Sequence, residues 1–258
     1  MFPTVLKVWC VWGLKSNPQT QTLFKCVIET TAITKSKLLG KSMKIKKVDY
    51  WEQRFQKEGT VWGNKPSVTV DIAVKNFKEF HVHSVLVLGS GYGRNTEALA
   101  KKGFQVSGIE ISKTALKIAE KSNKENNYGI DYKLGSVLEM SYPRESFDGV
   151  YCFNVLHFFQ KEGRKKFLEA VYQILKPEGV VFFTVFSEKE LSFGKGKQIE
   201  PNMFESKKRR PIYYFTKQDL NNHFKKYEIL ENKLVEEPEN HGGGPHTHIL
   251  RIIIARKK

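Results

Sequence analysis

Three closely spaced glycines follow a short apolar segment and are the clearest candidates for a binding site. The segment VLVL (85–88) leads into Gly89, Gly91 and Gly93, and a helical pattern begins at Arg94. Glycine allows backbone turns that other residues avoid, and it lets a ligand approach the chain closely. A strand, a glycine-rich turn and a helix in this order are typical of nucleotide sites at the edge of a parallel sheet.

The spacing of the glycines narrows the class of nucleotide. A dinucleotide fingerprint reads G-x-G-x-x-G, whereas this turn reads G-x-G-x-G, with Arg94 where the last glycine of the fingerprint would fall. A P-loop requires G-K-[ST] after four intervening residues, and that sequence does not follow. The turn therefore favours neither NAD nor a nucleoside triphosphate.

The elements that would position this turn alternate along the chain. Apolar residues at three- and four-residue spacing predict helices, and short apolar runs bounded by glycine predict buried strands. We expect helices over residues 48–58, 66–80, 95–103, 112–127, 161–175 and 215–227. We expect strands over residues 84–89, 104–111, 130–135, 147–155, 180–186, 228–237 and 248–258, and a polar, basic loop over residues 188–212.

This alternation predicts an α/β fold with a doubly wound parallel sheet. The last two strands have no helix between them, so they predict an antiparallel hairpin at the edge of the sheet. Residues 1–42 have no clear period and contain a single acidic residue, and we expect this N-terminal extension to lie outside the fold. The folded domain is predicted to cover residues 43–258, and Met43 is an alternative start of translation.

Composition excludes several classes of protein. The chain has 258 residues and is 40% hydrophobic, which suits one globular domain, and no apolar run approaches the ~20 residues of a membrane span. The net charge of +16 comes mainly from lysines that are interleaved with acids along the chain. We therefore favour a solvated basic surface, with a nucleic-acid partner as the alternative.

The cysteines indicate a reducing compartment. Cys10, Cys26 and Cys152 are odd in number, with no CxxC pair and no histidine at metal-ligand spacing. We expect no structural disulfide, a cytoplasmic location and no metal.

The glycine turn and three further features together resemble the class I S-adenosylmethionine (SAM) methyltransferases. Glu110 ends the second strand, where a carboxylate can accept both ribose hydroxyl protons. LKPEG (175–179) is similar to the LKPGG turn of these enzymes, and the final strand pair is similar to their reversed last strand. The resemblance implies the class I methyltransferase fold, a Rossmann-like doubly wound seven-stranded sheet with an antiparallel terminal hairpin strand.

Within this class, the sequence most resembles the tellurite-resistance (TehB-type) small-molecule methyltransferases. GYGRNTEALAKKGFQVSGIE (91–110) and RIIIARKK (251–258) carry the similarity, which covers roughly residues 48–258. The resemblance implies that SAM is the cofactor and that a small-molecule nucleophile, such as a thiol or chalcogen, is the acceptor. It therefore implies an EC 2.1.1 enzyme.

Site residues carried over from this family fall on the carboxyl ends of the strands. The glycine turn would line the methionine part of SAM, and Glu110 would hold the ribose. Residues near 111 and 136 would border the adenine, and residues 153–154 would lie beneath the sulfonium. The implied cofactor-binding residues are Gly89, Ser90, Gly91, Arg94, Asn95, Glu110, Ile111, Ser136, Val137, Phe153 and Asn154.

Two positions depart from the family pattern. Val87 stands where many members have an acid, and Ser136 stands where an Asp often receives the adenine amino group. Each loss removes a charge-assisted hydrogen bond worth about 1.5–3 kcal/mol. Arg54 is our candidate for a compensating cofactor contact.

Aromatic residues could attract the sulfonium through their faces. Trp51, Trp62, Tyr92 and Phe153 are the candidates, with ordinary packing an equally good explanation for the two tryptophans. We assign Trp51 to the cofactor site and Trp62 to the acceptor site, since both precede the glycine turn in the position of a lid.

The segment NVLHFF (154–159) follows the fourth strand at the edge where an acceptor would bind. We assign His157 and Phe158 to acceptor binding; His157 could take a proton from the acceptor, or it could simply pack beside the site. No residue is assigned as catalytic. The segment lacks both [DN]-P-P-[YF] and Pro-Cys, which argues against adenine-N6, glutamine and cytosine-C5 methylation.

Two further segments have competing explanations. The SKKRR sequence near residue 208 suits a solvated basic loop, a nucleic-acid contact or the steering of an anionic acceptor. HGGGPHTH (241–248) offers three histidines, and we expect a flexible hairpin tip without a metal because spacing reveals no further ligand.

Two alternatives to a small-molecule enzyme remain. The net charge favours an RNA or protein methyltransferase, and the departures at Val87 and Ser136 favour a SAM-binding regulator without catalysis. The sequence gives no indication of oligomeric state.

Overall fold

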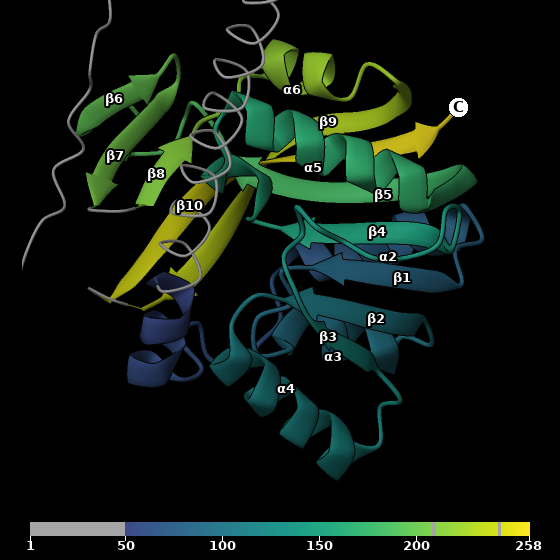
Figure 1. The fold of residues 1–258 in the computed structure, drawn as a ribbon. Helices are drawn as coiled ribbons and strands as arrows, with labels where there is room; N and C mark the ends of the chain where they lie inside the picture. The colour runs from purple at the N-terminus through teal and green to yellow at the C-terminus, as the bar shows by residue number, and fades with distance from the viewer. Residues whose placement is uncertain (1–49, 208–209, 242–243) are drawn as a thin grey trace, which may run out of the picture. The chain divides into compact units, whose positions relative to one another are not determined.

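The structure is a computed structural model that describes residues 50–258, with gaps at 208–209 and 242–243 (Figure 1). The predicted extension over residues 1–42, with Cys10 and Cys26, lies outside the described residues. None of the helices in the described part is both long and apolar enough to cross a membrane. The cytoplasmic location stays a prediction.

A seven-stranded sheet organises the described chain and confirms the predicted fold class. Its strand order is β3-β2-β1-β4-β5-β10-β9; β1 to β5 are mutually parallel, and β10 runs antiparallel to both of its neighbours. The strand order reverses between β1 and β4, which is where ligands bind in open α/β sheets. The strands are β1 (Ser84–Leu88), β2 (Gln105–Glu110), β3 (Asp131–Leu134), β4 (Phe147–Phe153), β5 (Leu175–Phe186), β9 (Tyr227–Asn240) and β10 (Pro245–Lys257).

Helices cover both faces of this sheet (Figure 1). Successive residues of a strand point to opposite faces, so Val85 and Val87 join one buried cluster while Leu86 and Leu88 join the other. Both sets are buried, which explains why β1 is apolar throughout. The helices are one over residues 50–58, α2 (Thr69–Glu79), α3 (Arg94–Lys101), α4 (Lys113–Asn126), α5 (Lys161–Ile174) and α6 (Lys217–His223), with a short 3-10 turn, η1 (Leu156–Phe158).

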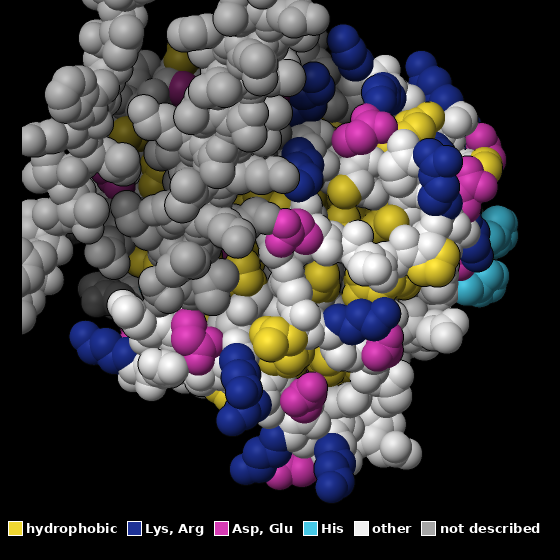
Figure 2. All heavy atoms as spheres, in the orientation of Figure 1, with side chains coloured by type: hydrophobic (Ala, Val, Ile, Leu, Met, Phe, Trp, Pro, Cys, Tyr) yellow, Lys and Arg dark blue, Asp and Glu magenta, His cyan; other side chains and the backbone are white. Residues whose placement is uncertain are grey.

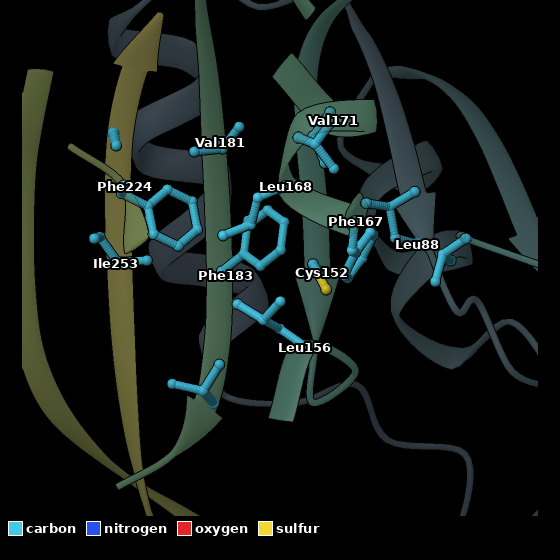
Figure 3. Packing of buried hydrophobic residues seen from close by; sticks show 14 of the residues in the cluster. Leu88, Cys152, Leu156, Phe167, Leu168, Val171, Val181, Phe183, Phe224 and Ile253 are labelled. Atoms are coloured by element: carbon cyan, nitrogen blue, oxygen red, sulfur yellow. The ribbon is translucent and has the colours of Figure 1, made fainter. Parts of the chain in front are cut away.

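The two clusters assign these helices to faces. Helices α2 and α3 supply Phe77 and Leu99 to the cluster that contains Val85. Helix α5 supplies Phe167 to the opposite cluster, where it packs near Cys152 and Phe183 (Figure 3). Cys152 is fully buried in this cluster as a free thiol, and burial raises its pKa.

The segment after β5 differs from the predicted loop. Within residues 188–212 the chain forms a separate antiparallel sheet of β6 (Lys197–Glu200), β7 (Met203–Lys207) and β8 (Arg210–Tyr213). Met203, Ile212 and Tyr213 are buried and anchor the small sheet. The prediction of a polar, basic loop was wrong because charged residues within each of these strands hid the strand pattern.

The boundaries of three further strands also differ from the prediction. Strand β5 begins at Leu175, directly after α5, so LKPEG belongs to the strand as an irregularity instead of forming a separate turn. Glu178 has a φ of 61°, which accommodates the extra residues opposite β4. Strands β9 and β10 are longer than predicted and carry their hairpin tip beyond the carboxyl end of β5, since Leu250 pairs with Phe186.

Candidate functional site

The glycine turn connects β1 to α3 at the switch point of the sheet. Gly89, Gly91 and Gly93 all have positive φ, at 69°, 57° and 98°. A Cβ on Gly89 would lie only 2.6 Å from a methyl carbon of Val155, so this position requires glycine. A Cβ on Gly91 would meet nothing nearer than the Phe55 ring at 3.9 Å. The backbone at Gly91 therefore faces room for a ligand.

Glu110 lies at the carboxyl end of β2 and holds this turn in place. Its Oε2 accepts a hydrogen bond from the Gly91 N–H at 2.8 Å, and its Oε1 accepts one from the Ser112 N–H at 2.8 Å. The carboxyl is buried, and burial raises its pKa above the ordinary value of 4.5, although the two N–H groups oppose the shift. Each oxygen has a second lone pair, so the carboxylate can also accept from a bound hydroxyl.

Ser112 caps the first turn of α4. Its backbone is extended, and its hydroxyl accepts a hydrogen bond from the Ala115 N–H at 3.1 Å. Glu52, on the helix over residues 50–58, reaches the same helix end and accepts from the Ser112 hydroxyl at 2.7 Å. It also accepts from the Thr114 hydroxyl at 2.6 Å and the Thr114 N–H at 3.1 Å. Glu52 thus fastens the first helix beside Glu110, a role that the sequence did not indicate.

An aromatic cluster forms on this fastened helix. Trp51 lies 5.1 Å from Phe158 and 6.3 Å from Trp62, measured between ring centroids. Trp62 stacks on Tyr92 of the glycine turn at 6.2 Å, and the guanidinium of Arg54 lies 5.2 Å from the Trp62 ring. The structure therefore brings together the four predicted residues Trp51, Arg54, Trp62 and Phe158.

Arg94 and Asn95 bind the segment that carries Trp62. The Arg94 guanidinium donates to the carbonyls of Trp62 and Lys65 at 3.3 and 3.2 Å, and Asn95 Oδ1 accepts from the Ser67 N–H at 2.9 Å. The opposite side of the guanidinium pairs with Glu239 of β9 at 3.0 Å. These contacts make Arg94 the junction of the glycine turn, the segment over residues 60–67 and the terminal hairpin.

The residues predicted to border the adenine differ from one another in burial. Ile111 follows Glu110 and is half-buried, whereas Val137 is buried and packs in the hydrophobic core. The Ser136 hydroxyl accepts from the Leu138 N–H at 3.2 Å. The Ser90 hydroxyl is buried and has no hydrogen-bond partner among the residues that the structure describes.

At the end of β4, Phe153 lies 5.6 Å from the Arg94 guanidinium, so it borders the same junction. Asn154 has a φ of 56°, a conformation that is uncommon for a residue other than glycine. Its N–H donates to the Thr184 hydroxyl at 3.0 Å, which fixes the turn that leaves β4.

His157 lies in η1 and is fully buried. Its ring centroid is 4.3 Å from that of Phe158 and 4.5 Å from that of Phe186. Its Nδ1 accepts a hydrogen bond from the Phe186 N–H at 3.4 Å. His157 therefore supports Phe158 from beneath instead of presenting a ring nitrogen to an open site.

The hairpin tip holds a cluster that the sequence did not predict. Glu239, His241, His246 and His248 each offer a ligand atom, and these atoms all lie within 4.8 Å of one another. The spacing along the chain concealed Glu239, because its position opposite His246 depends on the register of β9 against β10.

Part of the chain is similar in sequence to known methyltransferases. Residues 86–183 match the family described as "Methyltransferase domain". The ubiquinone biosynthesis O-methyltransferase of Chromobacterium violaceum is 32% identical over 104 residues, which are 40% of this chain and 44% of that relative. The matched part of the chain therefore spans less than half of that relative.

Solved structures resemble a larger part of the chain. TehB from Haemophilus influenzae has a TM-score of 0.58 and 18% identity, and the match covers 81% of this chain and 67% of that one. The 1,6-didemethyltoxoflavin-N1-methyltransferase of Burkholderia thailandensis was solved with bound 1,6-didemethyltoxoflavin and S-adenosylhomocysteine. It has a TM-score of 0.63 and 17% identity, and the match covers 96% of this chain and 93% of that one. These matches confirm the class I methyltransferase fold and the resemblance to SAM-dependent methyltransferases such as TehB.

Proposed function

We propose that the chain is a SAM-dependent methyltransferase that acts on a small-molecule nucleophile. The observation that carries the proposal is the pairing of Glu110 with the Gly91 N–H at the switch point of the sheet. A buried carboxylate beside an open glycine suits a ribose whose two hydroxyls donate hydrogen bonds. The residues therefore fit the cofactor that the family uses.

The remaining contacts of the cofactor follow from this placement. The room at Gly91 would take the methionine part, and the half-buried Ile111 would border the adenine. We retain the other predicted cofactor contacts as part of the proposal: Trp51, Arg54, Gly89, Ser90, Arg94, Asn95, Ser136, Val137, Phe153 and Asn154.

Catalysis by this chain would consist mainly of alignment. When bound, SAM would supply a methyl group on its sulfonium: a bond from the nucleophile to the methyl carbon would form in line as the carbon–sulfur bond breaks, with its electrons left on sulfur. Trp51, Trp62 and Phe158 offer apolar faces that exclude water and attract a cation, each contributing ~0.5–2 kcal/mol. Holding the reactants in this geometry supplies much of the rate enhancement.

We also propose that the methyl acceptor is a thiol or a chalcogen compound. His157 is buried against Phe186, so its geometry favours a packing role over proton transfer. A soft nucleophile needs little help from a base, which suits a site of aromatic rings. The C. violaceum relative is named for ubiquinone biosynthesis, and the B. thailandensis protein is named for 1,6-didemethyltoxoflavin; both names refer to small molecules.

Nothing in the described structure favours RNA over a small molecule. On the face shown in Figure 2, Lys and Arg side chains are interspersed with Asp and Glu instead of forming one basic patch. An RNA methyltransferase and a SAM-binding regulator therefore stay as alternatives that the experiment below separates.

The test combines SAM binding with a screen of acceptors. Calorimetry measures SAM binding to the wild type, to Glu110→Ala and to Glu120→Ala, a matched control on the exposed face of α4. Release of S-adenosylhomocysteine is then followed with thiols, selenite, tellurite, halides, amines and RNA. We expect turnover with a thiol or chalcogen and loss of binding in Glu110→Ala alone. Binding without turnover would favour the regulator, turnover only with RNA would favour the second enzyme, and absence of SAM binding would refute the proposal.

A further inference from the structure

The hairpin tip between β9 and β10 brings four metal-ligating side chains together. Glu239 lies opposite His246 in the register of the two strands, and His248 follows on the same face of β10. His241 comes directly after β9 and places its ring 4.7 Å from that of His246. One ligand atom from each of the four lies within 4.8 Å of the others.

The outer ring nitrogens of two histidines face groups that can only accept a hydrogen bond. His246 Nδ1 lies 2.9 Å from the Gly244 carbonyl, and His248 Nδ1 lies 2.7 Å from Oε1 of the buried Glu190. A carbonyl or carboxylate in this position requires a proton on Nδ1. In the neutral rings, both Nε2 atoms then carry lone pairs.

These two Nε2 atoms point at each other across 3.2 Å. Two lone pairs at this distance repel unless a proton or a metal ion lies between them. Hydrogen bonds from Nδ1 to a carboxylate or a carbonyl are also the usual way in which proteins orient histidines that bind a metal through Nε2.

The carboxylate of Glu239 completes the cluster. Its Oε1 is held by Arg94 at 3.0 Å, which leaves Oε2 directed at the histidines. Oε2 lies 2.7 Å from Nε2 of His241 and 3.8 Å from Nε2 of His248. Tetrahedral Zn²⁺ with bonds of ~2.0–2.1 Å places its ligand atoms about 3.3 Å apart. Three of the six separations in the cluster, at 2.7, 3.2 and 3.8 Å, bracket that value, and the others lie within 4.8 Å.

We propose that the hairpin tip binds one divalent transition-metal ion, Zn²⁺ by preference, through Nε2 of three histidines and Oε2 of Glu239. Three imidazoles exclude Ca²⁺ and Mg²⁺, which prefer oxygen ligands. Four protein ligands fill a tetrahedral shell, as in structural zinc sites. Glu190 and the Gly244 carbonyl orient the ligands from outside, and Glu239 links the ion to Arg94. The ion therefore fastens the hairpin to the glycine turn.

The test measures metal binding directly and does not depend on SAM or on turnover. The full chain, without a histidine tag, is stripped with a chelator and titrated with Zn²⁺ against a chromophoric competitor. We expect one equivalent to bind, and Co²⁺ to give the intense visible bands of a tetrahedral ion. Removing the orienting carboxylate in Glu190→Gln is expected to weaken Zn²⁺ binding by about 10–100-fold.

Variants that remove a proposed ligand are expected to weaken Zn²⁺ binding more than Glu190→Gln does. His246→Ala and His248→Ala are compared with His83→Ala, whose histidine is exposed and lies far along the chain from the tip. Circular dichroism checks that each variant folds, and His246→Gln provides a milder substitution if the alanine variant does not. A wild type that takes up no Zn²⁺ would overturn the proposal in favour of a proton between the histidines. Equal binding by wild type and folded His246 and His248 variants would also overturn it.

Discussion

The Glu110 carboxylate and the Gly91 N–H lie 2.8 Å apart, so the end of β2 holds the glycine turn that leaves β1. The same carboxylate binds the start of α4 through the Ser112 N–H. One buried group therefore sets the geometry of two segments at the switch point.

SAM affinity is expected to fall on acidification because ribose hydroxyls donate to the ionised form of Glu110. Burial raises the pKa of this carboxyl above 4.5, so its free form gains a proton at a higher pH than an ordinary glutamate. Affinity should therefore decline as the pH falls through this raised pKa, before 4.5 is reached. Calorimetric titration of SAM at a series of pH values measures the effect.

Glu110→Gln provides the control for that pH dependence. We expect it to bind SAM about 10- to 150-fold more weakly at neutral pH, as befits a lost charge-assisted hydrogen bond of ~1.5–3 kcal/mol. Its residual affinity should change little over the range in which the wild type loses affinity. If the SAM affinity of both the wild type and Glu110→Gln fell steeply at low pH, a group other than Glu110 would be responsible for the pH dependence.

Glu52→Gln is expected to destabilise the fold at neutral pH. Burial acts to raise the pKa of Glu52, but hydrogen bonds from Thr114 and Ser112 outweigh it and lower the pKa from 4.5 to about 2. A lowered acid pKa stabilises the folded state above 4.5, and that contribution disappears as the pH falls towards 2. The difference in melting temperature between wild type and variant should shrink across this window.

Glu120→Gln serves as the matched control, since Glu120 is exposed on α4. It should melt like the wild type throughout. A difference between wild type and Glu52→Gln that persists unchanged at low pH would contradict an electrostatic role for Glu52.

Arg94→Lys is expected to loosen the segment over residues 60–67. The guanidinium donates to the Trp62 and Lys65 carbonyls and pairs with Glu239, and the single ammonium of lysine cannot reproduce this fork. Hydrogen exchange should become faster in this segment, and SAM affinity should fall. Arg144→Lys, at an exposed contact with Gln173, should leave both unchanged. An unchanged rate of hydrogen exchange over residues 60–67 in Arg94→Lys would contradict the role of Arg94 in holding this segment.

Gly89→Ala is expected to destabilise the fold more than Gly103→Ala. Both positions have positive φ, but a Cβ on Gly89 would collide with Val155 at 2.6 Å, whereas a Cβ on Gly103 would meet nothing within 4 Å. The difference in the free energy of unfolding should be about 1–3 kcal/mol, typical of overpacking. Chemical denaturation measures it.

A double-mutant cycle with Val155→Ala isolates the collision. The removal of the Val155 methyls should cost less in the Gly89→Ala background than in the wild type. Additive effects would show that the backbone conformation alone accounts for the loss.

The sequence predicted the site best where function depends on neighbours along the chain. The apolar run of β1 and the glycines after it are local signals, and both lie where they were expected. The antiparallel pairing of the last two strands followed from the lack of a helix between them, whereas the seven-stranded sheet with a reversed last strand came from the resemblance to a family.

The residues that the sequence missed act over long separations. Glu52 reaches Thr114, and Glu239 reaches Arg94, so neither role leaves a pattern in the local sequence. Strands β6 to β8 escaped prediction for a different reason, because charged residues in each strand hid the apolar ones, such as Met203 and Ile212. His157 was assigned from its position in the chain, which gave no information about its burial between two phenylalanines.

The two halves of β10 are under different structural constraints. The half of the strand that pairs with β5 is committed to the hydrophobic core, and any insertion there would shift every buried contact. The half beyond Phe186 pairs only with β9 in the sheet, so the core does not fix its length, although Glu237 and Glu239 of β9 tie the hairpin to Ser67 and Arg94. Selection can therefore remodel the rim of the site through a single hairpin while the architecture beneath it stays the same.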